Sequence, residues 1–118
     1  MRIDSLEFGR ITIDGRTYTT DLLIFPDGRV QDRWRRSRGH VLSREDLSPL
    51  LAAAPREIVV GTGVNGRMRP TAGLVSALAA EGVHLTLLPN GEARARYNQC
   101  VRQRGENQHL AACFHLTC

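Results

Sequence analysis

One stretch in the middle of the chain constrains the fold most, because its hydrophobic period changes twice. Residues 57–60 form a short apolar run, residues 71–81 repeat apolar side chains at helical spacing, and residues 83–88 form a second apolar run. Runs rich in Val, Ile and Leu with little alternation are typical of parallel strands covered on both faces. Pro70 suits the first turn of the helix, and Gly82 suits its C-terminal cap. The stretch therefore predicts a βαβ unit.

Turn signals and apolar runs predict the remaining elements. The expected strands before the βαβ unit are residues 11–13, 17–25 and 30–34, with turns at Asp14-Gly15 and at residues 26–28. The other expected elements are a short helix over 44–53, a helix over 91–104 that Asn90 caps and Gly105 ends, and a strand over 109–116. We expect an α/β fold: a single three-layer domain over residues 1–118 with a central mixed sheet and an N-terminal antiparallel strand extension.

The composition is that of a globular protein and argues against several other classes. A chain of 118 residues, 42% hydrophobic and 24% charged, can bury one core. No apolar run approaches the ~18 residues of a membrane helix, and the N-terminal residues lack the apolar centre of a leader, so we expect a cytoplasmic protein without membrane association. The three cysteines contain no C-x-x-C pair, which predicts reduced thiols and no four-ligand zinc site.

Gly61, Gly63 and Gly66 have the G-x-G-x-x-G spacing of dinucleotide-binding loops. That fold needs a helix that begins within the glycine motif and a carboxylate at the end of the following strand. Here residues 67–70 delay the helix, and residues 88–90 carry no carboxylate. The Gly-Lys-Ser/Thr of a phosphate-binding P-loop is also missing. The sequence therefore predicts neither a nucleotide site nor another cofactor.

An anion site is the interpretation that remains for this loop. Glycines expose backbone amides, and Arg67 and Arg69 place two cations beside them near a helix N-terminus. The candidate pocket for a small anionic ligand comprises Gly61, Thr62, Gly63, Gly66, Arg67, Arg69, His40 and Asn98. The alternative is that the glycines only make a tight exit from the strand.

Two members of this pocket have alternative interpretations of their own. Imidazole is the usual general base and a common ligand in proteins, so His40 could take either role, or it could hydrogen-bond backbone at a turn. Asn98 is a poor helix former in the middle of a predicted helix, which indicates a hydrogen-bonding duty. That duty is either to clamp the glycine loop or to bind a ligand in it.

His109, Cys113 and His115 share one face of the last predicted strand and carry side chains that bind metals. Side chains two residues apart on a strand are about 6.6 Å apart, since the rise is about 3.3 Å per residue. One strand seldom supplies three ligands to one ion, so we expect no metal site. Cys118 is a candidate reactive thiol only if a neighbouring group activates it.

The run Arg33 to Arg38 contains Trp34 among four arginines. An aromatic ring among cations suits stacking and phosphate contacts with nucleic acid. Because Trp34 alternates with arginines at the end of a predicted strand, a buried tryptophan with solvated neighbours is the favoured interpretation. All 16 basic residues are arginine against 12 acids, and the net charge of +4 is modest, so compositional bias explains the arginines as well as nucleic-acid binding does.

The order of several short motifs resembles the Mth938-like domain, or DUF498, family. The motifs are Trp34 followed by arginines, Gly39-His40-Val41-Leu42, Glu45-Asp46-Leu47, Gly61-Thr62-Gly63 with the later Pro70, and Ala93, Tyr97 and Asn98. The resemblance extends from about residue 5 to 116. It departs from the family at Pro89-Asn90-Gly91, where a small hydroxyl residue is usual, and at Arg104-Gly105-Glu106, which scrambles a glutamate-glycine-arginine turn.

The resemblance implies a compact α/β domain without established enzymatic activity. Its relatives include a respiratory complex I assembly factor, which implies protein interaction as a role. We therefore expect a non-enzymatic interaction or assembly module with no catalytic residues, in which the surface around Gly61 to Arg69, His40 and Asn98 recognises an unidentified protein partner or a small anion. An enzyme or ligand-binding domain that uses Arg67, Arg69 and His40 is the alternative, and nucleic-acid binding through Arg33 to Arg38 is a third interpretation. A free hairpin edge would also allow the domain to form a homodimer.

Overall fold

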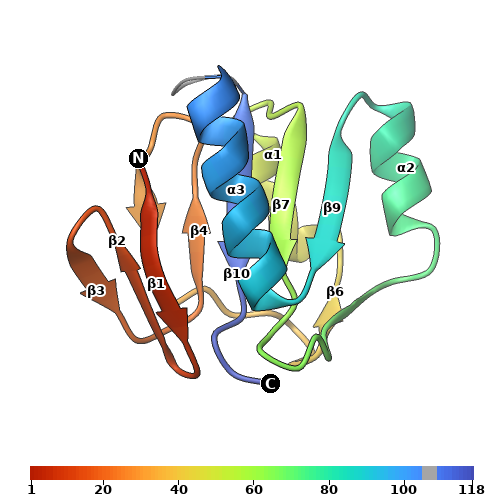
Figure 1. Cartoon of the computed structure of the whole chain (residues 1–118). Helices are drawn as coiled ribbons and strands as arrows, with labels where there is room; N and C mark the ends of the chain where they lie inside the picture. The colour runs from red at the N-terminus through yellow and green to blue at the C-terminus, as the bar shows by residue number, and fades with distance from the viewer. Residues whose placement is uncertain (105–108) are drawn as a thin grey trace.

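A five-stranded mixed sheet forms the centre of the molecule (Figure 1), and the computed structural model describes residues 1–104 and 109–118. Its strand order is β5-β4-β10-β7-β9. Strands β7 (Glu57–Gly61), β9 (His84–Leu88) and β10 (Leu110–Phe114) run parallel, whereas β4 (Leu22–Ile24) pairs antiparallel with β10 and with β5 (Val30–Gln31). The predicted α/β fold with a mixed central sheet is confirmed.

The predicted βαβ unit is β7, helix α2 (Leu74–Ala80) and β9, with the two strands paired in parallel. The helix begins later than expected, because Gly73 at its N-terminus has φ 78°. The prediction that Pro70 starts this helix is wrong: Arg69–Pro70 form β8, which pairs in parallel with β6 (Val41–Leu42). Gly82, at φ 85°, follows the helix as predicted, and its amide donates to Ala79 O.

Helix α3 (Asn90–Arg104) and a separate three-stranded antiparallel sheet cover one face of the central sheet. That sheet contains β1 (Ile3–Glu7), β2 (Arg10–Ile13) and β3 (Arg16–Tyr18). It is the N-terminal extension that the turn signals predicted, although β1 itself was not expected. The expected strand over 17–25 is two strands in different sheets. Asp21 lies between these two strands, and its carboxylate accepts a hydrogen bond from Leu116 N at 2.8 Å.

The opposite face is covered by α2, by the 3₁₀ turn η1 (Glu45–Leu47) and by the one-turn helix α1 (Ser48–Leu51). Ile58 and Val60 of β7 point into this layer, whereas Val59 points toward α3. The strand is buried along its whole length, as its lack of polar alternation predicted. The two apolar clusters on either side of the sheet give the three layers.

The expected strand over 30–34 ends at Gln31, because Arg33 adopts φ 56° and turns the chain. Trp34 then enters the core at 6% exposure, and its Nε1 donates to Asp46 O at 3.0 Å. The favoured interpretation of a buried tryptophan is therefore correct. The predicted end of the last helix at Gly105 lies outside the described residues. No described helix is both long enough and apolar enough to cross a membrane.

Candidate functional site

The backbone amides of the glycine loop are occupied by acceptors from this chain itself. Thr62 N donates to Leu88 O at 2.9 Å, and Gly63 N donates to Asn90 Oδ1 at 3.0 Å. Farther along the loop, Val64 N donates to Thr117 O at 2.7 Å, and Arg67 N donates to Cys118 O at 3.1 Å. An anion at this loop would have to displace these internal acceptors, so the loop geometry does not supply the free amides that the sequence suggested.

Two of the glycines are required by close approach. A Cβ at Gly61 would lie 2.6 Å from Asn90 Oδ1 and against the Phe114 ring. Gly63 has φ 114°, and a Cβ there would lie 2.5 Å from the carbonyl carbon of Cys118. These glycines let α3 and the chain after β10 pack directly on the loop, which supports the interpretation of a tight strand exit.

Asn90 joins the loop to the end of the chain. Its side chain is buried, and its Oδ1 accepts from Gly63 while its Nδ2 donates to His115 O at 2.8 Å. Its backbone amide donates to Gly63 O at 3.0 Å. The expectation that Asn98 lies at the glycine loop is not met, because both of its amide atoms bond the backbone of Ile3 at 2.9 Å and hold β1. Asn98 has the predicted clamping duty but at another strand.

Arg67 and Arg69 differ in how far their side chains are already bonded to the loop. The Arg69 guanidinium donates to the carbonyls of Gly66 and Met68, and the Arg69 backbone amide donates to His40 O at 2.8 Å. The Arg67 side chain is exposed and has no ion pair within the described residues. The structure thus places His40 beside Arg69. Both loop arginines are exposed, but Arg69 is tied to the loop by its guanidinium, whereas no side-chain hydrogen bond or ion pair of Arg67 is found within the described residues.

A cluster that the sequence did not predict lies beside this loop. His40 Nε2 is 3.4 Å from Cys118 Sγ, and the His40 and His115 rings meet edge to face with centroids 5.3 Å apart. One ligand atom from each of the three residues lies within 4.8 Å of the other two. The single-strand set of His109, Cys113 and His115 does not form: Cys113 is fully buried in the core and His109 is exposed.

Asp21 and Arg36 form a polar network with His115, one member of this cluster. His115 Nδ1 lies 2.8 Å from Asp21 Oδ2 and 3.0 Å from Arg36 Nη2, so an acceptor and a donor meet at the same ring nitrogen. The Arg36 side chain is 5% exposed, and its Nη1 forms an ion pair with Asp21 Oδ2 at 3.0 Å. Its Nε donates a hydrogen bond to Gly39 O at 2.8 Å. The guanidinium also stacks on Trp34, with Cζ 4.8 Å from the ring centroid. Arg36 is therefore a buried structural cation and not a surface one.

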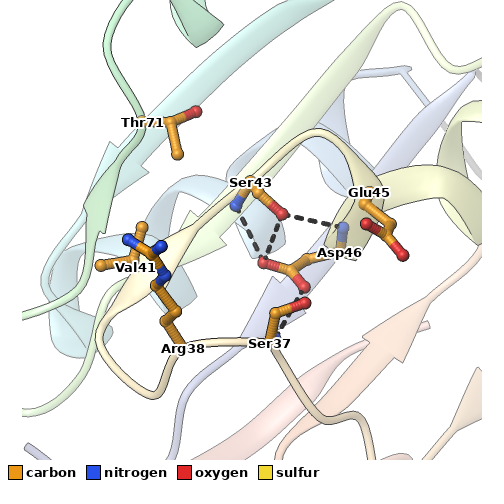
Figure 2. A pocket seen from close by; sticks show the side chains of 7 residues that line it. All are labelled: Ser37, Arg38, Val41, Ser43, Glu45, Asp46 and Thr71. Carbon is orange, nitrogen blue, oxygen red and sulfur yellow. Dashed lines mark hydrogen bonds between the residues drawn. The ribbon is translucent and has the colours of Figure 1, made fainter.

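A hollow of about 330 Å³ lies on the segment between β5 and η1, and Figure 2 shows its lining. The lining residues are Ser37, Arg38, Val41, Ser43, Glu45, Asp46 and Thr71. The buried carboxylate of Asp46 accepts from Ser37 N at 3.2 Å, from Ser43 N at 2.8 Å and from Ser43 Oγ at 2.9 Å. These bonds hold the loop from Ser37 to Asp46 together, and Asp46 is the buried residue of the lining.

A second hollow of about 380 Å³ adjoins the first, since both are lined by Ser37, Glu45 and Asp46. Arg33 and Arg35 line only the second hollow, and Arg38 lines only the first. We call the exposed surface of residues 31–48 that bears both hollows the arginine face. The face shares His40 with the predicted anion pocket and meets it at one edge, because Val41 of the first hollow pairs with Arg69 across β6 and β8.

The three-layer arrangement around a mixed sheet defines an α/β domain of the Mth938 fold. The solved structure of MT938 matches it with a TM-score of 0.79 at 33% sequence identity, covering 99% of this chain and 98% of that one. The chain belongs to the family described as protein of unknown function (DUF498/DUF598), whose model matches residues 3–115. The resemblance drawn from the short motifs is thereby confirmed.

Two further solved structures agree. The conserved hypothetical protein PH1505 from Pyrococcus horikoshii OT3 has a TM-score of 0.78 at 25% identity, with all of both chains covered. The Rpa2829 protein from Rhodopseudomonas palustris has a TM-score of 0.75 at 27% identity, covering 96% of this chain and 81% of that one. No curated protein matches this sequence.

Proposed function

We propose that this chain is a non-enzymatic interaction domain whose arginine face docks an acidic segment of a partner protein. The observation that carries the proposal is the position of Arg33, Arg35 and Arg38 around two adjoining hollows. A hollow can accommodate a bound peptide segment, and the surrounding cations favour a segment with negative charge. The partner is an unidentified protein, described here by its chemistry alone.

The three arginines of this face are free to pair with a partner. All three side chains are exposed, and none makes an ion pair among residues 1–104 and 109–118. The nearby Arg44 differs, since its guanidinium is held by Glu81 at 2.8 Å. The exposed acids of this face are Asp32 and Glu45, and they face three arginines that have no ion pair among the described residues. Arginine forks bind carboxylates in pairs of hydrogen bonds, which suits Asp and Glu side chains.

A protein partner has more support than nucleic acid. Single-stranded nucleic acid is held by aromatic side chains on which bases stack, together with a cationic groove. Trp34 is the aromatic residue of this face, but it is 6% exposed and already stacks on Arg36. The face therefore offers charge and shape without a stacking platform.

The alternative function, an enzyme or binding domain for an anion held by Arg67, Arg69 and His40, has less support. The loop amides and the Arg69 guanidinium already have internal partners. An arriving anion would replace these bonds at a cost of about 1–3 kcal/mol for each buried group left unpaired. Binding at the arginine face carries no such cost, because an acidic segment would replace only the water around Arg33, Arg35 and Arg38.

Selection from a displayed peptide library tests the proposal without knowledge of the partner. We expect enrichment of peptides rich in Asp and Glu, with affinity that falls as salt rises. Binding should be lost in the variant Arg33→Asn, Arg35→Gln, Arg38→Gln, where Asn is chosen because position 33 has φ 56°. The control variant Arg10→Gln, Arg16→Gln, Arg102→Gln removes the same charge from exposed positions elsewhere and should bind normally.

Three outcomes would overturn the proposal. They are selection of no acidic peptide, equal loss of binding in the control variant, and tight binding of an RNA oligonucleotide that the first variant abolishes. Size-exclusion chromatography of the free protein adds a fourth: a stable homodimer that the Arg33, Arg35, Arg38 variant disrupts would make a second copy the occupant of this face.

A further inference from the structure

We infer that His40, His115 and Cys118 form a binding site for a single zinc ion with one coordination position left open. The three side chains come from a loop, from the residue directly after β10 and from the last residue of the chain. Two imidazoles and one thiolate are ligands that Zn²⁺ prefers, and three protein ligands with an open fourth position are typical of sites where the metal meets a further ligand. This inference does not rest on Arg33, Arg35 or Arg38, although His40 lies in the same segment of the chain.

The spacing of the ligand atoms fits one small ion. A tetrahedral Zn²⁺ with Zn–S of about 2.3 Å and Zn–N of about 2.05 Å places its ligand atoms about 3.3–3.6 Å apart. Cys118 Sγ and His40 Nε2 are 3.4 Å apart. All three ligand atoms lie within 4.8 Å of one another, so rotation about side-chain bonds brings them to the required distances.

Asp21 prepares His115 for this role. Asp21 Oδ2 at 2.8 Å and Arg36 Nη2 at 3.0 Å both lie against His115 Nδ1 and hold the ring in place. The other ring nitrogen, Nε2, is 3.3 Å from the Thr117 hydroxyl and is the one that an ion can use. A carboxylate behind a ligating histidine is the usual support for a zinc ligand. Arg36 pairs with the Asp21 carboxylate at 3.0 Å, so the charged ligand of the ion is the Cys118 sulfur, which loses its proton when the metal binds.

Backbone hydrogen bonds hold the tail that bears Cys118 against the glycine loop. Cys118 O accepts from Arg67 N at 3.1 Å, and Thr117 O accepts from Val64 N at 2.7 Å. Gly63 lacks the Cβ that would strike the Cys118 backbone. Because the ligands are already positioned, binding needs little ordering of the chain.

The burial of the three ligands matches a site open on one side. His115 is buried, Cys118 is half-buried and His40 is exposed. An ion can thus enter from solvent past His40 and rest against the buried imidazole. The glycine loop acquires a role in this arrangement, since it supports the tail that carries the sulfur ligand.

Cobalt titration of the protein without a polyhistidine tag tests the site. We expect one Co²⁺ per chain, a thiolate-to-cobalt charge-transfer band in the near ultraviolet, visible bands of tetrahedral intensity, and displacement of Co²⁺ by one equivalent of Zn²⁺. Cys118→Ser should abolish the charge-transfer band. His40→Ala should weaken zinc binding by at least about tenfold, the size of effect that loss of even an outer-shell partner produces.

Matched controls separate this site from adventitious binding. His84 is exposed and lies outside the cluster, so His84→Ala should bind Co²⁺ as the unmodified protein does. Cys118 and His40 are chosen for substitution because neither is buried, and circular dichroism should show that both variants remain folded. Failure of the unmodified protein to bind Co²⁺ or Zn²⁺ saturably, or binding that survives both substitutions, would overturn the inference.

Discussion

Asn90 and Gly63 are joined by two hydrogen bonds: Gly63 N donates to Asn90 Oδ1 at 3.0 Å, and Asn90 N donates to Gly63 O at 3.0 Å. This reciprocal pair fixes the first turn of α3 on the glycine loop. Asn90 Nδ2 extends the connection to His115 O, so three segments distant in sequence meet at one buried amide. The pair explains why a loop with a nucleotide-binding spacing serves as a structural joint.

Asn90→Ala should lower the free energy of unfolding by about 2–4 kcal/mol. The substitution removes both side-chain hydrogen bonds and leaves the Gly63 amide and the His115 carbonyl buried without partners. Urea denaturation followed by circular dichroism measures the change. Asn65→Ala, at an exposed position of the same loop, is the control and should change stability by less than about 0.5 kcal/mol.

Gly61→Ala and Gly91→Ala should have opposite effects. A Cβ at Gly61 strikes the Phe114 ring and Asn90 Oδ1, so overpacking should cost about 1–3 kcal/mol. At Gly91, in the first turn of α3, a Cβ meets nothing within 4 Å, and alanine should stabilise the helix by up to about 1 kcal/mol. Thermal unfolding of the two variants gives the comparison. Equal midpoints would contradict the close packing assigned to Gly61.

The cysteines should differ in their reaction with iodoacetamide. Burial raises the pKa of the Cys113 thiol well above its ordinary value, and Cys100 is also buried. Cys118 is only partly buried and should be alkylated first in the native protein, whereas the other two should react only after unfolding. Mass spectrometry of the digested protein reads out the order. Native alkylation of Cys113 at a rate similar to that of Cys118 would contradict the burial of β10.

The pair of Arg44 and Glu81 predicts a small dependence of stability on pH. Hydrogen bonds from Arg44 lower the pKa of Glu81 below its ordinary value of 4.5. A carboxylate with a lowered pKa in the folded state stabilises the fold above its unfolded pKa, and that contribution is lost as the pH falls through the folded pKa. The stability difference between the protein and Glu81→Gln should therefore be present at pH 7 and vanish in acid. Since both side chains are exposed, high salt should remove it as well. A difference unchanged by acid and by salt would contradict the pairing.

Elements with a clear local period could be predicted from the sequence. The strands β7 and β9 and the helix between them show a hydrophobic pattern that depends only on nearby residues, and helix α3 was predicted from the capping residue Asn90 and the later Gly105. Their boundaries were less accurate, because the start of α2 is set by the positive φ of Gly73 and by the pairing of Pro70 with Leu42 across β8 and β6. Such pairing is invisible to a local pattern.

The site could be predicted only in part, because its contacts are long-range. Asn98 looked like the clamp of the glycine loop, but the clamp is Asn90, which local signals identified only as a helix cap. His115 was considered only with ligands on its own strand, whereas its neighbours His40 and Cys118 come from a distant loop and from the tail. Residue types suggested the chemistry, and only the fold brought the partners together.

The most direct test of the proposed function is an amide ¹H–¹⁵N NMR titration with a selected acidic peptide, repeated with inorganic phosphate. We expect the peptide to shift amide resonances of residues 31–48 and to leave those of residues 61–67 in place, and we expect phosphate to shift neither set at concentrations where the peptide saturates. Shifts confined to residues 61–67, with either titrant, would contradict the account and return the glycine loop to the centre of the protein's function.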